Sequence, residues 1–341
     1  MSGRPVDLGD AAWLAGPCGD EGAVGDAWLD REAARVGGRV LRGDPGAGLL
    51  DTMARLDGPG FTAASLAPEV RDFYEQTARW RLDVRMRWWP PAWPFGWLIS
   101  AVHARRLRQL SLPLRARDLT DGMTSTVVPV TGPDGVRAGT LWLRRLRATG
   151  AVVYSGWYGT ATLPGAAPRD VRDGAAARGA RGGAAAKEVR GGAAARGARG
   201  GAAAGDAPGG SAGVGERRPS VRVVFPLPNG RLVVLLRPEV TAGGGLRLTS
   251  PRGAWGGDGA YLVVERRGRA WARRIPVHET FHVYVDPAGT LRTDHDLRLW
   301  RLPALRLHYR MSRQPEADQG VANRVSTASG RTPGSARRKI R

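Results

Sequence analysis

The sequence predicts an α+β fold in which N-terminal helices pack on a large antiparallel β-meander, either a curved sheet or an up-and-down, lipocalin-like barrel. The first observation is a change of hydrophobic period, because apolar residues recur every three or four positions before Met123 and at every second position after it. The second is that short turn signals separate the alternating segments, as between consecutive antiparallel strands. The third is a Gly/Ala/Arg-rich stretch without any apolar period, which interrupts the strands.

Composition divides the 341 residues into five parts. They are a disordered N-terminus (1–20), a helical region (21–120), an antiparallel β domain (121–165 together with 220–312), a low-complexity insertion (166–219) and a disordered basic tail (313–341). Within the insertion, Gly174–Ala186 recurs unchanged as Gly192–Ala204. Ala, Gly and Arg provide no apolar face on which such repeats could stack, and the cost of closing a loop grows slowly with its length. We therefore expect an expanded surface loop between two strands of one sheet.

The helical region is predicted to contain four helices. The clearest spans about 67–87, where Pro68 occupies the first turn and apolar residues recur at three- and four-residue intervals as far as Val84. Three prolines between residues 90 and 94 should end it, because proline lacks the backbone N–H that a helix needs. The other helices are expected at Ala27–Val36, Leu49–Leu56 and 95–110.

About ten strands follow this region. Several are joined by strong turn signals, such as Asn229-Gly230 and Asp286-Pro-Ala-Gly. The predicted strands are Thr124–Val130, Arg137–Arg147, Val152–Leu163, Val221–Phe225, Leu232–Arg237, Leu246–Thr249, Ala260–Arg266, Trp271–Val285, Leu291–Leu299 and Leu305–Met311.

The hairpin closed by residues 286–290 allows a register to be predicted, because pairing must place apolar side chains opposite one another on one face. A five-residue loop pairs Val285 with Leu291 and continues along that face. The further pairs on this face are Val283 with Thr293, Phe281 with His295, and Glu279 with Leu297. The other face pairs Tyr284 with Arg292, His282 with Asp294, Thr280 with Asp296, and His278 with Arg298.

Residues 278–282, His-Glu-Thr-Phe-His, match the H-E-x-x-H pattern of zinc hydrolases. That chemistry needs a helix, which places both imidazoles one turn apart beside one metal. The surrounding residues are typical of a strand, on which His278 and His282 would lie roughly 13 Å apart. We therefore expect no metal site here, and no other motif predicts a cofactor.

Three residues of the same hairpin are the candidates for catalysis: Glu279, His295 and Asp294. A Glu and a His that face a concave interior would suit acid–base chemistry. The alternative, which we prefer, is a core histidine beside a carboxylate at the end of a strand. No nucleophile elbow, phosphate-binding loop or dinucleotide-binding glycine pattern is present. The protein is therefore predicted to be a binding protein rather than an enzyme.

Five of the twelve tryptophans fall between Trp80 and Trp97, and the segment from Arg79 to Arg117 holds nine arginines and one acidic residue. Trp and Arg suit an interface that is apolar on one side and anionic on the other. The rings could instead form the apolar seam by which two helices cover the sheet. The candidate contacts with a membrane or ligand are Trp88, Trp89, Trp93, Trp97, Arg85, Arg87, Arg105, Arg106 and Arg108.

The net charge of +21 indicates nucleic acid at first sight, but the insertion and the tail each contribute +5 of it. A nucleic-acid-binding alternative would therefore rest on the Arg-rich disordered segments. Cys18 is the only cysteine, so no intramolecular disulfide can form, and this favours a reducing cytoplasm.

Four short motifs resemble an uncharacterised protein family of high-GC Gram-positive (actinobacterial) bacteria. They are Phe73-Tyr74-Glu75 with Thr77, the hairpin starting at Phe225-Pro-Leu-Pro-Asn-Gly, Phe281–Asp286, and Leu291–His295. The resemblance covers about residues 50–311 and implies a cytoplasmic or membrane-associated protein without an assigned activity.

The leading hypothesis from the sequence is a non-enzymatic protein that binds a hydrophobic or lipid-like ligand inside a curved sheet. In this hypothesis the Trp/Arg segment docks on the inner face of the membrane, where the expected partner is an anionic lipid surface.

Overall fold

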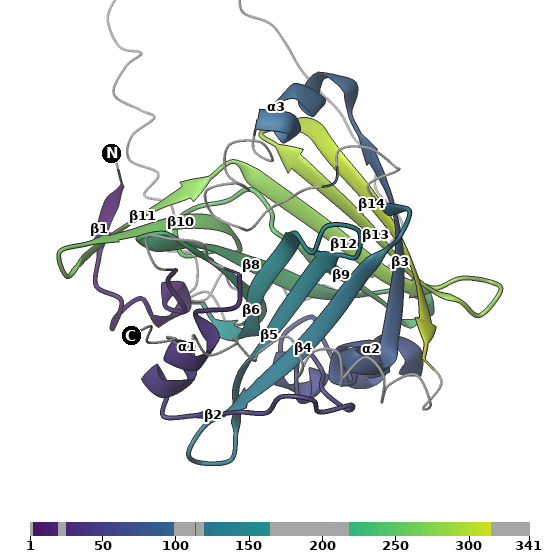
Figure 1. The fold of residues 1–341 in the computed structure, drawn as a ribbon, viewed down its shortest axis with the longest axis horizontal. Helices are drawn as coiled ribbons and strands as arrows, with labels where there is room; N and C mark the ends of the chain where they lie inside the picture. Colours follow the sequence, from purple (N-terminus) through teal and green to yellow (C-terminus); the bar gives the residue numbers. More distant parts are fainter. Residues whose placement is uncertain (1–2, 20–24, 99–112, 114–118, 164–217, 315–341) are drawn as a thin grey trace, which may run out of the picture.

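The computed structural model describes residues 3–19, 25–98, 113, 119–163 and 218–314, and in this part the chain is mainly β. Fourteen strands form one antiparallel sheet, and the helices are few and short (Figure 1). The predicted antiparallel meander is confirmed, whereas the large helical half of an α+β fold is not. The predicted insertion and basic tail lie almost entirely outside the described residues.

The strands follow the chain closely in their spatial order, β2-β4-β5-β6-β7-β8-β9-β12-β13-β14-β3. A side branch, β10-β11-β1, joins the first half of β8, while β9 pairs with its second half. The bounds are β1 Arg4–Val6, β2 Arg39–Val40, β3 Trp80–Trp88, β4 Met123–Thr131, β5 Arg137–Leu146, β6 Val152–Thr162, β7 Pro219–Leu227, β8 Gly230–Thr241, β9 Gly245–Thr249, β10 Gly259–Arg266, β11 Arg269–Ile275, β12 Val277–Val285, β13 Leu291–Leu299 and β14 Leu302–Arg313.

The sheet is curled but open, so the barrel alternative is wrong. Its two ends are β2, which has two residues, and β3, which pairs with β14. Strand β3 returns close to β4 (Figure 1), yet the two share no ladder of hydrogen bonds among the described residues. The curl brings strands that are distant in the order to face one another across a concave side.

The predicted long helix at 67–87 is also wrong. It ends early, as α2 (Pro68–Glu75), and the chain then forms edge strand β3. From Trp80 to Trp88 every second residue is apolar and the residues between are charged. Trp80 and Val84 are four residues apart, a spacing that fits one face of a strand as well as one face of a helix. Pairing with β14 decides for the strand.

Other boundaries shift for local reasons. The short helices become α1 (Leu29–Arg35) and a 3-10 turn (Met53–Leu56). The helix predicted at 95–110 begins as α3 (Trp93–Leu98), and its remainder lies outside the described residues. The strand predicted at 271–285 divides into β11 and β12 at Pro276, because proline cannot donate to a ladder.

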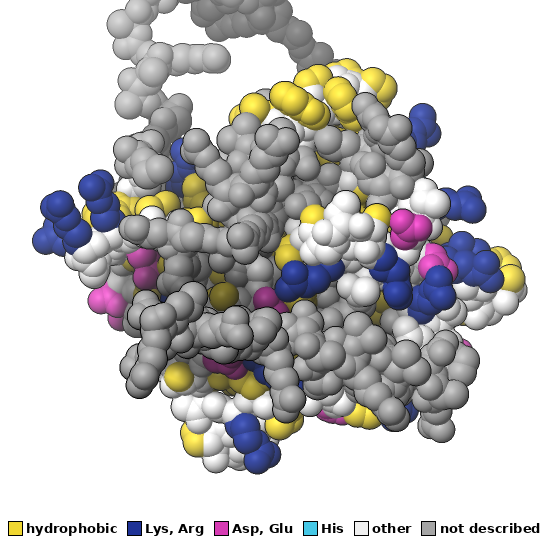
Figure 2. Space-filling model, viewed as in Figure 1, with side chains coloured by type: hydrophobic (Ala, Val, Ile, Leu, Met, Phe, Trp, Pro, Cys, Tyr) yellow, Lys and Arg dark blue, Asp and Glu magenta, His cyan; other side chains and the backbone are white. Residues whose placement is uncertain are grey.

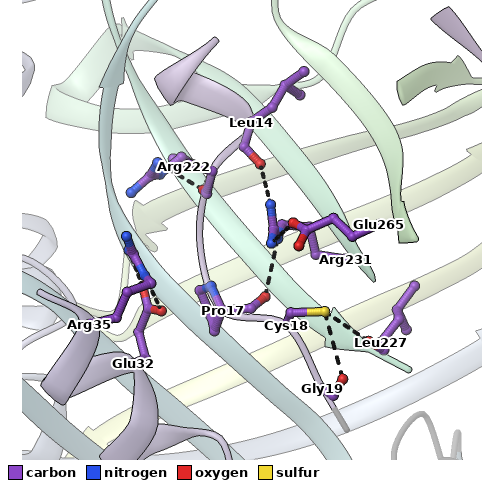
Figure 3. A network of polar contacts seen from close by, with 11 residues as sticks. Leu14, Pro17, Cys18, Gly19, Glu32, Arg35, Arg222, Leu227, Arg231 and Glu265 are labelled. Carbon is purple, nitrogen blue, oxygen red and sulfur yellow. Dashed lines mark hydrogen bonds and ion pairs between the residues drawn. The ribbon is translucent and has the colours of Figure 1, made fainter. Parts of the chain in front are cut away.

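The N-terminus forms β1 and a 3-10 turn (Ala12–Leu14) instead of a floppy start, and it packs on the outer face of the sheet. Trp13 and Leu14 are buried there. Figure 3 shows how polar contacts hold this segment, with Arg231 on β8 donating to the carbonyl groups of Leu14 (3.4 Å) and Pro17 (3.3 Å). Arg231 also pairs with Glu265 on β10.

The sheet has a core on each side. Strands that stand far apart in the order, such as β3 and β6, contribute to one cluster, which therefore occupies the concave side. The loops around α2 fill one end of that side with Leu49, Met53 and Phe73. The second core lies on the outer face under α1 and the N-terminal segment, and it includes Trp28 and Trp157.

Candidate functional site

A group of polar and aromatic side chains lies on the concave side, toward the end of the sheet that α2 does not fill. We call this group the inner cluster: Trp142 and Arg144 on β5, Tyr154 and Tyr158 on β6, Glu279 and Phe281 on β12, His295 on β13 and Tyr309 on β14. The guanidinium group of Arg144 lies 5.6 Å from the ring of Trp142 and 5.4 Å from that of Tyr309. Because β5 and β14 are far apart in the strand order, the curl alone brings these residues together.

Arg144 is buried, with 5% of its surface exposed. Its neighbours are aromatic rings, and Tyr154 is its direct cross-strand partner. Among the described residues no carboxylate lies within 4.0 Å of its guanidinium group, and its Nε has no hydrogen-bond partner. Burying an ionised group is costly unless it is paired, and cation–π contacts of about 2 kcal/mol offset only part of that cost. The cluster therefore contains an incompletely compensated cation.

The tyrosines of the inner cluster act as neutral hydroxyl groups. Tyr154 donates to the hydroxyl group of Tyr158 at 2.6 Å, and both rings meet Trp142 edge to face. Burial raises the pKa of Tyr154 and of Tyr158 well above the ordinary value. Burial also raises the pKa of Tyr309, against the opposing effect of the Arg144 cation. All three hydroxyl groups keep their protons at neutral pH, and those of Tyr158 and Tyr309 can donate to a further acceptor.

The predicted hairpin register is confirmed at every pair, and it places Glu279 and His295 together on the inward face. Oε1 of Glu279 lies 3.8 Å from Nε2 of His295, which is too long for a hydrogen bond. The His295 ring stacks on Phe281 with centroids 3.8 Å apart. Among the described residues its Nε2, like the Nε of Arg144, is buried without a partner.

Asp294, the third candidate, does not join this pair. It lies on the opposite face of β13, where its carboxylate contacts Nδ1 of His308 at 2.7 Å and the hydroxyl group of Tyr284 at 3.4 Å. Successive residues of a strand point to opposite faces, so adjacent candidates cannot share a site. The grouping of all three residues is therefore corrected to Glu279 and His295.

The H-E-x-x-H motif lies on strand β12, as its context predicts. His278 and His282 both point outward and have separate partners, because Nδ1 of His278 contacts the carbonyl oxygen of Ser250 and Nε2 of His282 contacts Oγ1 of Thr241, each at 3.1 Å. His282 is thus paired with Asp294 in the ladder, as predicted, while its Nε2 contacts Thr241 on β8. Within the described part of the chain, no group of three or more His, Cys, Asp or Glu residues is placed to hold a metal.

The Trp/Arg segment divides into inward and outward parts. Trp80 is buried in the core, and Trp88 is half-buried and donates through Nε1 to the carbonyl group of Pro113 at 3.1 Å. Trp89, Trp93 and Trp97 are exposed, and Trp97 exposes 51% of its surface. The predicted contacts Arg105, Arg106 and Arg108 lie outside the described residues.

The sequence did not indicate that the turn between β13 and β14 belongs to the same surface. Trp300 in this turn is 63% exposed and Leu302 is 56% exposed. The backbone N–H of Trp89 donates to Ala304, which places the turn at the end of the sheet that carries α3. We call this surface the apolar rim: Trp89, Trp93, Trp97, Leu98, Trp300 and Leu302. Figure 2 shows apolar side chains gathered over α3.

Arginines cover the outer face of β3 and β14 beside the apolar rim. Arg85 and Arg87 are exposed, as are their cross-strand neighbours His308 and Arg306. Arg306 pairs with Asp296 at 2.5 Å, whereas Arg85 and Arg87 have no carboxylate partner among the described residues. Like charges directly opposite in a ladder are destabilising. The charges of Arg85 and Arg87 are thus not offset by a carboxylate partner among the described residues.

The buried tyrosines make stability depend on pH, and we expect the protein to lose stability as the pH rises above 10.0, the ordinary tyrosine pKa. Burial raises the pKa of Tyr74 in the folded state, so above this pH the unfolded chain releases its proton first and unfolding is favoured. Each unit of difference between the folded-state and unfolded-state pKa contributes about 1.4 kcal/mol.

Urea unfolding at about pH 8 and about pH 11 measures the loss of stability. Tyr74→Phe should be nearly neutral at the lower pH and should lose less at the higher one, and an equal loss in both proteins would contradict the assignment to Tyr74.

None of the described helices is long and apolar enough to cross a membrane. Comparison with protein-family models, with curated proteins and with solved structures gives no match to this chain.

Proposed function

We propose that the protein is a non-enzymatic binding protein that docks on an anionic membrane surface and takes a hydrophobic or lipid-like ligand on the concave side of its sheet. The observation that carries the proposal is the position of the apolar rim, which adjoins both the basic outer face of β3 and the inner cluster.

The rim concentrates apolar surface at one end of the molecule. Among the described residues, six of the seven exposed large hydrophobic side chains belong to it, and Val136 is the other. A gathering of this kind marks an interaction surface, whereas isolated exposed hydrophobic residues are common. Tryptophan favours the membrane–water boundary because its ring is apolar and its N–H is polar.

The charge beside the rim favours an anionic surface as the partner. Arg85 and Arg87 lie near the end of edge strand β3, which Trp89 of the apolar rim directly follows, so they lie close to a ring that would enter the headgroup region. Each arginine near an anionic membrane contributes about 1 kcal/mol. The approach of lipid phosphates also relieves the repulsion between Arg87 and Arg306.

The inner cluster lies directly behind the rim. Glu279 is opposite Leu297, and the ladder continues through Leu305 to Trp88 at the end of β3. The opposite end of the concave side is filled by the loops around α2. A lipid-like ligand that leaves the membrane at the rim would therefore meet aromatic walls formed by Trp142, Tyr154 and Phe281 and their neighbours.

Co-sedimentation with vesicles tests the membrane part. The natural protein should bind phosphatidylserine-containing vesicles more strongly at low salt than at high salt, and should bind phosphatidylcholine vesicles weakly. Replacing Trp89, Trp93 and Trp97 by Ala should reduce the affinity at least tenfold, whereas Val136→Ala should not. The double reversal of Arg85 and Arg87 to Glu should remove the salt dependence.

The matched charge control is the double reversal of Arg266 and Arg267 to Glu. These arginines are also exposed, but they lie at the end of β10 and in the turn that follows it, away from the rim. Equal loss in both double reversals would mean that net charge alone attracts the protein. Absence of vesicle binding by the natural protein would refute docking.

The two alternatives from the sequence have less support. An acid–base enzyme would have to work with Glu279 and His295 alone, because Asp294 faces the other way. Binding of nucleic acid through residues 166–219 and 313–341 stays a prediction, since nearly all of these residues lie outside the described part of the chain.

A further inference from the structure

We propose that the inner cluster is the receptor for the carboxylate headgroup of an amphipathic acid, with Arg144 as the residue that binds the carboxylate. The inference rests on the proposed function, since the apolar part of such a ligand would occupy the concave side. It extends that function by specifying the charge and shape of the ligand's headgroup.

The state of Arg144 is the first argument. The other deeply buried arginine, Arg231, is 3% exposed and has two backbone carbonyl groups and Glu265 as partners. Arg144 is almost as buried, but its guanidinium group lies against the rings of Trp142 and Tyr309, and its Nε has no hydrogen-bond partner among the described residues. A buried guanidinium group with an unused N–H needs an acceptor that carries negative charge. The described residues do not supply one, and in this proposal a ligand does.

The geometry of guanidinium favours a carboxylate. Nε and one Nη of arginine form a planar fork that matches the two oxygens of a carboxylate. The facing Tyr309 carries a neutral hydroxyl group, because burial raises its pKa. This hydroxyl group can donate to an oxygen that the fork leaves free, whereas the proton of Tyr154 is already donated to Tyr158.

The charge of the cluster favours a single negative charge. The raised pKa of Tyr154 is caused mainly by burial, then by the neighbouring Tyr158, and to a smaller extent by Glu279. Glu279 also contributes to the raised pKa of Tyr309. This carboxyl group therefore acts on the same part of the concave side as Arg144. Repulsion from this carboxyl group therefore opposes a ligand of high negative charge. A carboxylate adds one further negative charge, whereas a phosphate monoester would add close to two at neutral pH. The site therefore selects a carboxylate over a phosphate.

His295 provides an independent sign of a polar ligand. Its side chain is 11% exposed, and its buried Nε2 has no hydrogen-bond partner among the described residues. Nε2 of His295, which lies 3.8 Å from Oε1 of Glu279, and Nε of Arg144 thus both lack a hydrogen-bond partner among the described residues. They lie on two walls of the same concave side, β13 and β5. Buried polar atoms in folded proteins nearly always have partners, so two such atoms in one cluster indicate a polar group between the walls.

The test compares probes that differ only in the headgroup. Dodecanoic acid, methyl dodecanoate, dodecanol and dodecyl phosphate are titrated below their micelle concentrations, without vesicles, and binding is followed by calorimetry and by tryptophan fluorescence. We expect the acid to bind at least tenfold more tightly than the ester, the alcohol or the phosphate. Arg144→Met should bind the acid and the ester equally, while Arg147→Met, an exposed arginine just beyond the same strand, should keep the preference.

The outcomes separate this inference from the proposed function. Equal binding of acid and ester by the natural protein would overturn the role of Arg144 but leave a hydrophobic binding site, and tighter binding of the phosphate would overturn the choice of carboxylate. If none of the probes binds, both the headgroup and the ligand-binding part of the proposed function fail, while vesicle binding is judged by its own experiment. The ratio of acid to ester affinity in the natural protein decides the matter even if Arg144→Met does not fold.

Discussion

Replacing Arg231 by methionine is expected to lower the free energy of unfolding by about 3 kcal/mol. The side chain is nearly fully buried and donates to the carbonyl groups of Leu14 and Pro17 while it pairs with Glu265. Methionine fills a similar volume but leaves both carbonyl groups without a donor, and removing one partner of a buried polar network typically costs about 3 kcal/mol or more. The N-terminal segment should then separate from the outer face of the sheet (Figure 3).

Urea denaturation measures this loss, and limited proteolysis detects release of the segment that carries Trp13. Arg266→Met is the matched control, because this arginine is exposed at the end of β10 and its replacement should change stability by less than about 0.5 kcal/mol. If Arg231→Met were as stable as that control and as resistant to protease, the contacts of Arg231 would not hold the N-terminus.

Replacing Gly48 by alanine should destabilise the protein by about 3 kcal/mol. The added methyl group would overlap the carbonyl group of Glu75 at the end of α2 and lie 2.5 Å from the carbonyl oxygen of Tyr74. The segment cannot retreat, because the carbonyl group of Gly48 accepts from Arg137 at 2.8 Å and from Thr140 at 3.2 Å. Overpacking a closed site costs about 1–3 kcal/mol, and here the clash is with backbone atoms.

Gly46→Ala is a close control, since it makes the same change two residues earlier. Its methyl group would meet a single atom within 4 Å, Oδ1 of Asp44 at 3.5 Å, which is an ordinary contact. Thermal unfolding of the two variants should therefore differ by several degrees, with Gly48→Ala the less stable. Similar melting temperatures would show that the loop before α2 can move aside at little cost.

Predictions from the sequence succeeded where short-range pattern decides the structure. The β12–β13 register followed from matching apolar residues across a five-residue loop, and it correctly placed Glu279 and His295 on one face. The same alternation explains why Asp294 cannot join them, because it is adjacent to His295 on the strand and therefore faces the other side of the sheet. The three candidates were chosen for their chemistry alone. The prediction that His278 and His282 lie on a strand also succeeded, because it depended only on the residues that surround them.

Predictions failed where one local pattern fits two structures. A spacing of four, as between Trp80 and Val84, is compatible with both helix and strand. Only the exposed edge of β14, a strand more than two hundred residues later, pairs with this segment and makes it β3. The apolar rim was missed in part for a related reason, because Trp300 is an isolated apolar residue in a turn and only tertiary structure places it near Trp89.

The sequence by itself determined the antiparallel meander, most of its strands and the face on which each hairpin residue lies, since these depend on alternation and on turns between neighbours. Tertiary structure decided that the sheet stays open and that β3 forms its edge. It also decided that Arg144 meets Tyr309 across the concave side. Arg144 is one of 52 basic residues and has no distinguishing signal in the sequence. Its importance arises from burial, which depends on the way the whole sheet curls.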